Sequence, residues 1–164
     1  MTAVAIRVAA VTVSDTRTAA DDASGQCLRE RLQAAGFTVS FRAIVRDDPD
    51  AIRESIASIC QGDLADAIVT TGGTGIAPRD RTYEAIEGLL EKKLDGFGEA
   101  FRRLSWDEVG ARAVLSRAVA GVYRGRVIAA LPGSPKAVAL AVDAILAPIL
   151  EHAVMLARGQ NPRH

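Results

Sequence analysis

A glycine-rich segment, residues 71–75, reads Thr-Gly-Gly-Thr-Gly and directly follows a short apolar run. Its three glycines have no Cβ atom, so their backbone amides can approach phosphate oxygens closely. The threonine between them adds a hydroxyl donor. The segment lacks the Lys-Ser/Thr pair of a Walker A loop and the third glycine of the dinucleotide fingerprint. Alone, it indicates either a phosphate site or a tight turn between a strand and a helix.

Two aspartates, Asp47 and Asp80, lie in different predicted loops that should meet at one edge of a sheet. Paired carboxylates at such an edge can hold a magnesium ion that bridges phosphate groups. Either residue could instead be an ordinary turn aspartate. Asp48 is better explained as a helix N-cap, and a cap or turn also accounts for Asp22.

Other polar residues allow two interpretations. Lys136 lies near a predicted helix start, where the helix dipole disfavours a cation, so it either meets a phosphate or is simply solvated. Ser116 and Arg117 either bind a second anion or only begin a strand. His152 and His164 occupy the last helix and the last position, which does not suit a catalytic base.

Apolar, β-branched runs alternate with helical periods, which predicts an α/β fold with a mostly parallel sheet and helices on both faces. The predicted strands are residues 6–13, 38–45, 67–71, 118–123 and 127–131. The tight-turn pair Arg124-Gly125 favours an antiparallel arrangement of the last two strands.

The helices are predicted from their caps and apolar stripes. One begins at an N-cap, Ser24, and is closed by Gly36, and a second follows Asp48 and a first-turn proline. Residues 82–115 are expected to be mostly helical with interruptions at two glycines, at positions 96 and 98. A long apolar helix is predicted over residues 135–157, kinked by a proline at position 148.

The composition bounds the class of protein. The chain has 164 residues, 49% hydrophobic and 24% charged, which suits one globular domain spanning residues 1–164 and excludes wholesale disorder. Its formal net charge of zero argues against nucleic acid or an anionic membrane as partner. Cys27 and Cys60 lack a partner motif and are expected to be free thiols. With no basic leader and no apolar run of membrane-spanning length, we expect a cytoplasmic protein.

The ordered motifs resemble those of the MoaB/Mog family of molybdenum cofactor biosynthesis proteins, from about Val11 to Ala147. The motifs are residues 71–75 followed by Pro-Arg-Asp at 78–80, Gly-Phe-Gly-Glu at 96–99, Leu-Ser-Arg-Ala at 115–118, and Leu-Pro-Gly-Ser-Pro-Lys at 131–136. The resemblance implies a three-layer, Rossmann-like α/β sandwich that forms a homotrimer and works with other proteins of the pathway. It implies a molybdopterin adenylyltransferase, which joins AMP from ATP to the molybdopterin phosphate with Mg²⁺ and releases pyrophosphate.

The resemblance also assigns roles by position. Asp47 and Asp80 would serve the metal and the transfer. The cofactor-binding residues would be Ser14, Asp15, Gly72, Gly73, Thr74, Gly75, Ser116, Arg117, Pro132, Gly133, Ser134 and Lys136. Some family members are inactive and differ in the acidic loop after the second strand, whereas this chain retains Asp47. The alternatives are a pterin-binding or assembly module without turnover and a generic domain that binds nucleotides or sugar phosphates.

Overall fold

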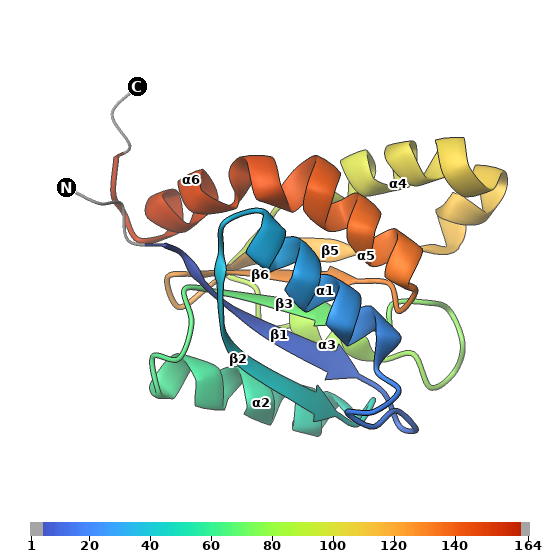
Figure 1. The fold of residues 1–164 in the computed structure, drawn as a ribbon, viewed down its shortest axis with the longest axis horizontal. Coiled ribbons are helices and arrows are strands. Elements are labelled where there is room, and N and C mark those ends of the chain that lie inside the picture. Colours follow the sequence, from blue (N-terminus) through green and yellow to red (C-terminus); the bar gives the residue numbers. More distant parts are fainter. Residues whose placement is uncertain (1–4, 162–164) are drawn as a thin grey trace.

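The computed structural model describes residues 5–161 and contains one six-stranded mixed sheet (Figure 1). The strand order is β2-β1-β3-β6-β5-β4. The first four in this order run parallel, whereas β5 is antiparallel to β6 and β4 is antiparallel to β5. The strands are β1 (Arg7–Val13), β2 (Thr38–Val45), β3 (Ala67–Thr71), β4 (Lys92–Lys93), β5 (Val119–Tyr123) and β6 (Arg126–Leu131).

Helices cover both faces of the sheet, so the molecule has three layers (Figure 1). The segments of one layer are α1 (Ala23–Ala34), α4 (Asp95–Val109), α5 (Pro135–Ala141), the π-helical turn η2 (Val142–Leu146) and α6 (Ala147–Ala157). The other layer holds α2 (Pro49–Gln61) and α3 (Thr82–Glu87). Because Val69 packs in the first layer's core and Ile68 in the second's, consecutive residues of β3 face opposite layers. The three-layer α/β fold expected from the sequence is confirmed.

The start of α1 differs from the sequence-based expectation. Ser24 was expected to be the N-cap, but Asp22 caps the helix by accepting a hydrogen bond of 3.0 Å from the Gly25 amide. The second carboxylate oxygen of Asp22 accepts a 2.7 Å hydrogen bond from the Thr12 hydroxyl of β1. A carboxylate can satisfy both donors at once, which a serine hydroxyl in the helix cannot. The N-cap expected at Asp48 is confirmed, because its side chain accepts a hydrogen bond of 2.9 Å from the Ala51 amide at the start of α2.

Residues 82–115 also differ in part from the expectation. The segment contains α3, the short strand β4, α4 and a 3₁₀ segment, η1 (Gly110–Leu115). Gly96 and Gly98 do not interrupt a helix but lie in the first turns of α4. A Cβ on Gly98 would stand 2.9 Å from the Ala118 carbonyl oxygen and 2.8 Å from the Arg102 guanidinium, so this glycine lets α4 approach the start of β5. A close approach is therefore the reason for Gly98, rather than a chain break.

The last helix is continuous from Pro135 to Ala157, and its middle turn, η2, is π-helical. Pro148 has no amide hydrogen, and its ring crowds the preceding turn, which accounts for the wider turn directly before α6. Contrary to the expectation that no apolar run reaches membrane-spanning length, this helix is long and apolar enough to do so. In the fold its apolar side instead packs on the sheet, with Val138, Leu146 and Leu150 fully buried.

A buried carboxylate joins the two ends of the described chain. Asp66 accepts hydrogen bonds from the Arg7 backbone amide at 2.8 Å and the Arg7 guanidinium at 2.9 Å, and it also pairs with Arg158 beyond α6. Burial alone would raise the pKa of Asp66, but these donors outweigh it and lower the pKa to about 2. The pair of Arg7 and Arg158 therefore holds Asp66 ionised.

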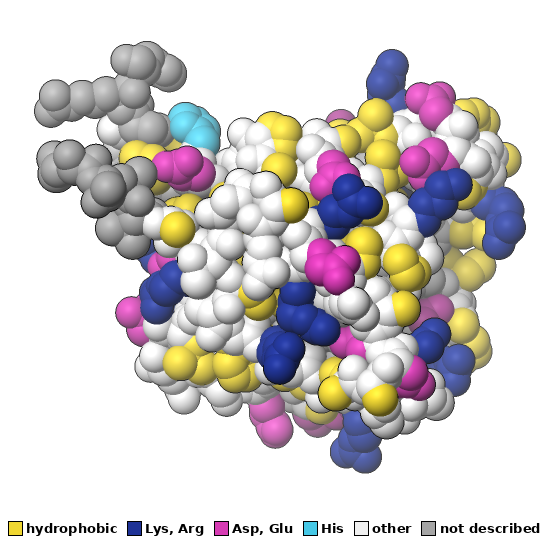
Figure 2. Space-filling model, in the orientation of Figure 1, with side chains coloured by type: hydrophobic (Ala, Val, Ile, Leu, Met, Phe, Trp, Pro, Cys, Tyr) yellow, Lys and Arg dark blue, Asp and Glu magenta, His cyan; other side chains and the backbone are white. Residues whose placement is uncertain are grey.

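Charged side chains of both signs are mixed on the drawn face, and the two cysteines are unpaired. Acidic and basic side chains are interspersed on the face drawn in Figure 2. Cys27 is partly buried on α1 and Cys60 is buried on α2, and both are free thiols, as expected. His164 lies outside the described residues.

Candidate functional site

The loops after β1, β2 and β3 meet at one edge of the sheet and enclose a small polar pocket of about 120 Å³. This carboxylate pocket contains one aspartate from each of the three loops, Asp15, Asp47 and Asp80, together with Gly73. Its remaining lining residues are Val13, Ser14, Thr16 and Arg79. Asp47 and Asp80 therefore lie in the same pocket, as a magnesium ion held by both would require.

Asp47 is held by the Arg81 backbone amide and by the Asp15 side chain. Its Oδ1 accepts a 3.1 Å hydrogen bond from the Arg81 amide, and its own amide donates to Asp15 Oδ1 at 3.0 Å. Burial raises the pKa of Asp47, and the nearby charges of Asp80 and Asp15 raise it further, while the Arg81 amide acts in the opposite direction. A carboxylate that is disfavoured in this way gains from a neighbouring cation.

Asp80 shapes the loop after β3. Its Oδ2 accepts a 2.9 Å hydrogen bond from the Ala77 amide, and a Cβ on Gly75 would stand 2.7 Å from that oxygen. A Cβ on Gly73 would likewise stand 2.7 Å from Asp47 Oδ2. Both glycines are therefore required for the carboxylates to lie against the backbone of the loop.

Gly72 contacts the backbone of two neighbouring strands, β6 and β1. The Gly72 amide donates to the Leu131 carbonyl oxygen at 2.9 Å, and a Cβ there would stand 2.3 Å from the Val13 carbonyl oxygen. Both Gly72 and Gly73 have positive φ, 101° and 73°. Thr74 is buried. Of the glycine segment, Gly73 is the residue that lines the carboxylate pocket.

Arg117 binds the loop that carries Asp80. Its Nε and terminal nitrogen donate to the Gly75 carbonyl oxygen at 3.0 and 2.7 Å, and the same terminal nitrogen donates to the Asp80 carbonyl oxygen at 3.2 Å. The guanidinium also pairs with Glu84 and lies 5.1 Å from the centre of the Tyr83 ring. The side chain thus spans the loop and α3.

The segment between β6 and α5 lies beside the glycine segment. The Pro132 carbonyl oxygen accepts from the Thr71 hydroxyl at 2.8 Å, and a Cβ on Gly133 would stand 3.4 Å from the Gly72 Cα. Ser134 caps α5 by accepting from the Ala137 amide at 3.1 Å. Lys136 is exposed. Within residues 5–161, none of 132–136 lines the carboxylate pocket, so their assigned roles remain predictions.

Ser14, Asp15, Ser116 and Arg117 divide between two places. Ser14 and Asp15 line the carboxylate pocket, where Ser14 Oγ accepts from the Arg17 amide at 3.0 Å. Ser116 and Arg117 instead line a larger pocket beside the start of α4.

Sequence reasoning missed three residues of this region. Arg79 and Thr16 line the carboxylate pocket. Arg79 lies inside the Pro-Arg-Asp motif, and Thr16 directly follows Ser14 and Asp15. The Thr82 hydroxyl is buried, lies beside Gly73, and has no hydrogen-bond partner among the described residues. Its position two residues after the Pro-Arg-Asp motif was the available signal.

A cation at this site would need ligands beyond the protein. Within residues 5–161, no group of three His, Cys, Asp or Glu side chains is arranged to hold a metal ion. Two carboxylates in one pocket still fit a hard divalent cation that takes its other oxygens from phosphates and water.

Comparison with known proteins gives the family. The family described as "Probable molybdopterin binding domain" matches residues 9–152. The chain belongs to the MoaB/Mog family. The resemblance expected from the sequence motifs is therefore confirmed.

Relatives of the MoaB/Mog family cover nearly the whole chain. Molybdenum cofactor biosynthesis protein B of Staphylococcus aureus is 47% identical over 152 residues, which are 91% of this chain and 90% of the relative. A crystal structure of a molybdenum cofactor biosynthesis protein B has a TM-score of 0.91 at 41% identity and covers 95% of this chain and 98% of that one. The Mog protein of Mycobacterium ulcerans has a TM-score of 0.84 at 33% identity and covers 96% of this chain and all of that one, 100%.

Proposed function

We propose that this protein transfers AMP from ATP to the terminal phosphate of molybdopterin and releases pyrophosphate. The observation that carries the proposal is the carboxylate pocket, in which Asp47 and Asp80 lie together beside Gly73 at the carboxyl ends of the parallel strands. This edge is where open α/β sheets bind their ligands. Membership of a molybdenum cofactor biosynthesis family supports molybdopterin as the acceptor.

The transfer makes one bond and breaks one. An oxygen of the molybdopterin phosphate attacks the α-phosphorus of ATP, and the bond from that phosphorus to the oxygen bridging the β-phosphorus breaks. Such an acceptor is already ionised at neutral pH, so no protein nucleophile or catalytic histidine is needed. The protein must position the two phosphates and stabilise the charge that develops between them.

Each residue of the carboxylate pocket has a role in this positioning and charge stabilisation. Asp47 and Asp80 would hold Mg²⁺, which when bound neutralises phosphate charge. Arg79 adds a cation to the same pocket, and the lack of a side chain at Gly73 lets a phosphate approach the backbone. Asp15 fixes the Asp47 backbone by accepting its amide hydrogen.

Asp80→Asn tests the proposal. The amide oxygen can still accept from the Ala77 amide, so the loop keeps its shape while the charge is lost. With ATP, Mg²⁺ and molybdopterin, we expect the variant to lose at least about 100-fold in the rate of pyrophosphate release.

Asp50→Asn, an exposed change on α2, is the matched control and should retain the wild-type rate. If wild-type protein forms no adenylylated pterin at saturating substrate, the adenylyltransferase proposal fails. Tight pterin binding without turnover would then assign the protein as a binding or assembly module.

The assembly and the location of the protein are further parts of the proposal. We infer a homotrimer from the family resemblance, and the exposed apolar side chains Trp106, Val109, Val114 and Leu115 supply surface that association would cover. Light scattering of the purified protein gives the mass directly, and a monomer would reject the trimer. We infer a cytoplasmic location from the use of ATP, and contact with other proteins of the pathway from the family resemblance.

A further inference from the structure

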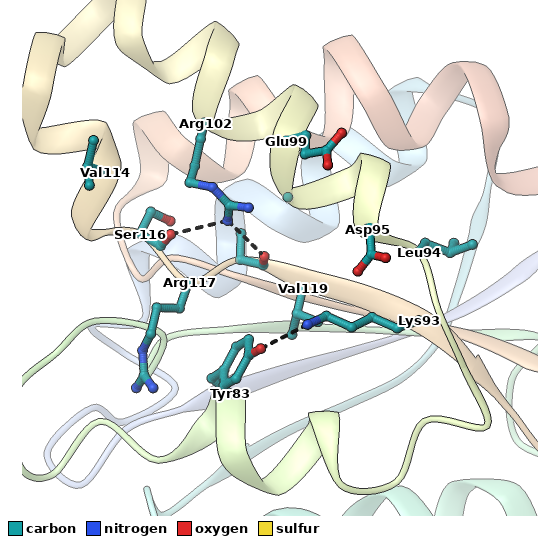
Figure 3. Close-up of a pocket in the computed structure, with 12 residues that line it drawn as sticks. Tyr83, Lys93, Leu94, Asp95, Glu99, Arg102, Val114, Ser116, Arg117 and Val119 are labelled. Atoms are coloured by element: carbon teal, nitrogen blue, oxygen red, sulfur yellow. Dashed lines mark hydrogen bonds between the residues drawn. The ribbon is translucent and has the colours of Figure 1, made fainter.

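The strand β2 forms an open edge of the sheet. It comes first in the strand order and, in residues 5–161, pairs with a neighbour on one side only, β1. The pocket beside α4 that Figure 3 shows belongs to the opposite half of the sheet, because it lies against β5. The strands β1, β3 and β6 stand between β5 and β2. The edge at β2 is therefore a separate surface of the protein.

The end of β2 directs the backbone groups of two residues away from the sheet. The Val45 carbonyl oxygen accepts from the Ser14 amide at 2.8 Å, so Val45 faces β1. Successive residues of a strand point their N–H and C=O groups to opposite sides, so Ala43 also faces β1, whereas Arg42 and Ile44 face outward. Within the described part of the chain, neither outward residue makes a backbone hydrogen bond beyond the pairing with β1.

A pocket of about 390 Å³ lies between this edge and α1. Arg42 pairs in register with Ala10, which packs in the core on the α1 side, so the Arg42 side chain lies on that side of the sheet. There it lines the pocket together with Arg29 of α1, and Figure 2 shows basic side chains close together between α1 and β2. The other lining residues of this β2 pocket are Ala19, Asp22, Ala43 and Ile44.

The β2 pocket has a surplus of positive charge. Arg42 is exposed and forms no ion pair with any carboxylate of residues 5–161. Arg29 lies 3.9 Å from Asp22, which is a long ion pair. Asp22 already accepts hydrogen bonds from the Thr12 hydroxyl and the Gly25 amide. Two guanidinium groups therefore share one carboxylate whose oxygens are both in use, and the pocket suits an added anion.

We propose that an extended segment of another protein adds to the outer edge of β2 as a further strand and places acidic side chains in the β2 pocket. Its backbone pairs with the outward groups of Arg42 and Ile44. Its carboxylates, on the face toward α1, pair with Arg42 and Arg29. In strand addition the main-chain hydrogen bonds supply affinity, and pockets for alternate side chains select the partner. This binding is independent of the adenylyltransferase function.

A second copy of this chain does not suit the edge. Two β2 strands related by a two-fold axis pair antiparallel, and matching their outward groups sets Arg42 of one copy opposite Ile44 of the other. The two Arg42 side chains are then diagonal neighbours on one face, and β2 itself carries no acidic residue to separate them. Like charges at this range destabilise such a pairing, so the partner is a different, acidic segment.

Fluorescence anisotropy with labelled peptides tests the surface. The probe is a fluorescein-labelled Val-Glu-Val-Glu-Val peptide, whose two glutamates lie on one face of an extended strand. We expect saturable binding, and binding at least about tenfold weaker for Val-Gln-Val-Gln-Val, because the charge-assisted pairs are lost. The glutamate peptide with N-methylated amides lacks the backbone donors of a strand and should not bind.

A variant and its control locate the binding. Arg42→Gln should weaken the glutamate peptide about tenfold and leave the glutamine peptide unchanged. Arg31→Gln is the matched control, because Arg31 is an exposed arginine of α1 that pairs with Asp143 and lies outside the pocket lining. It should bind the glutamate peptide as wild type does. The Tm of each variant, measured alongside, shows that the fold is kept.

Hydrogen exchange followed by NMR tests the backbone pairing in wild-type protein. Without peptide, the outward amides of Arg42 and Ile44 should exchange faster than those of Ala43 and Val45, which face β1. Saturating glutamate peptide should slow exchange at Arg42 and Ile44 by at least about tenfold, because both amides then donate to the added strand.

Each part of the proposal has an outcome that overturns it. No binding of the glutamate peptide at millimolar concentration would mean that Arg42 only keeps other strands away from the edge. Wild-type affinity in Arg42→Gln would reject the charge pairing. Unchanged exchange at Arg42 and Ile44, or equal binding of the N-methylated peptide, would reject strand addition. A dimer in which the same two amides are protected without peptide would assign the edge to a second copy.

Discussion

Asp47 has a predicted consequence for the pH dependence of the transfer. Burial and the charges of Asp80 and Asp15 raise its pKa, so it takes up a proton at a higher pH than an ordinary aspartate. A protonated carboxyl cannot hold a cation, and we therefore expect kcat/KM to fall on the acid side with a midpoint above the usual aspartate range. A pH–rate profile of wild-type protein measures this midpoint.

The same raised pKa has a stability counterpart. Because the folded state favours the protonated form, the charge on Asp47 opposes folding above its raised pKa. Asp47→Asn without metal should then be at least as stable at neutral pH as wild type. A lower Tm for this variant would contradict that account.

Arg117 is expected to act by position rather than by charge. Arg117→Lys keeps the charge but loses the fork that spans the Gly75 and Asp80 carbonyl oxygens. We expect kcat to fall about tenfold, with a loss of about 1–3 kcal/mol in the free energy of unfolding. Arg53→Lys, at an exposed pair on α2, is the control. Full activity in Arg117→Lys would show that charge alone suffices.

At the residue scale, the sequence located the acids better than their neighbours. Asp47 and Asp80 were predictable because carboxyl ends of parallel strands share an edge, whatever the details of the loops. The surroundings of Arg117 and the buried Thr82 hydroxyl were not, because they depend on how the 75–81 loop folds back on α3. Such nonlocal contacts leave no period in the sequence.

Among the elements, the turn after β3 makes the most specific prediction. Gly73→Val places a branched side chain at a φ of 73° and within 2.1 Å of the Thr82 hydroxyl oxygen. We expect a loss of at least about 2 kcal/mol in the free energy of unfolding and no detectable ATP binding. Thermal unfolding and calorimetry measure the two effects.

Gly96→Ala is the matched control, because no atom stands within 4 Å of its added Cβ and its φ is not positive. Gly96 lies in the same family motif as Gly98. The variant therefore also shows whether a glycine of this motif is needed where the packing does not require it. Normal stability and normal ATP affinity in Gly73→Val would show that the turn tolerates a side chain.

The elements were predicted closely where their signal is local. β2 and β3 match the expected ranges, and the Arg124-Gly125 turn joins antiparallel strands with positive φ at both residues. The two-residue strand β4 was not predictable, because it exists only through its pairing with β5. Gly98 of α4 was misread for the same reason, since its cause is the neighbouring strand β5 rather than the helix itself.

For the whole molecule, Asp66 predicts a loss of stability in acid. Its pKa is lowered to about 2 in the folded protein, below the ordinary value of 3.8. Its contribution, on the order of 2 kcal/mol, is therefore present above pH 3.8 and is lost as the pH falls toward 2. Denaturant unfolding at a series of pH values measures it.

Asp66→Asn is the comparison for this prediction. The variant should be less stable than wild type at neutral pH, and the difference should shrink as the pH approaches 2. A difference that stays constant with pH would mean that Asp66 contributes by packing alone.

Because Asp66 pairs with both Arg7 and Arg158, the order of synthesis on the ribosome affects when its contacts form. A nascent chain that stops before α6 has Asp66 without one of its two cations, and the sheet face that Leu150 and Val154 cover stays open to water. Synthesis must therefore pass α6 before Asp66 has both of its cations. Polypeptides released before that point should be targets for chaperones and proteases, although every residue that lines the carboxylate pocket has by then been translated.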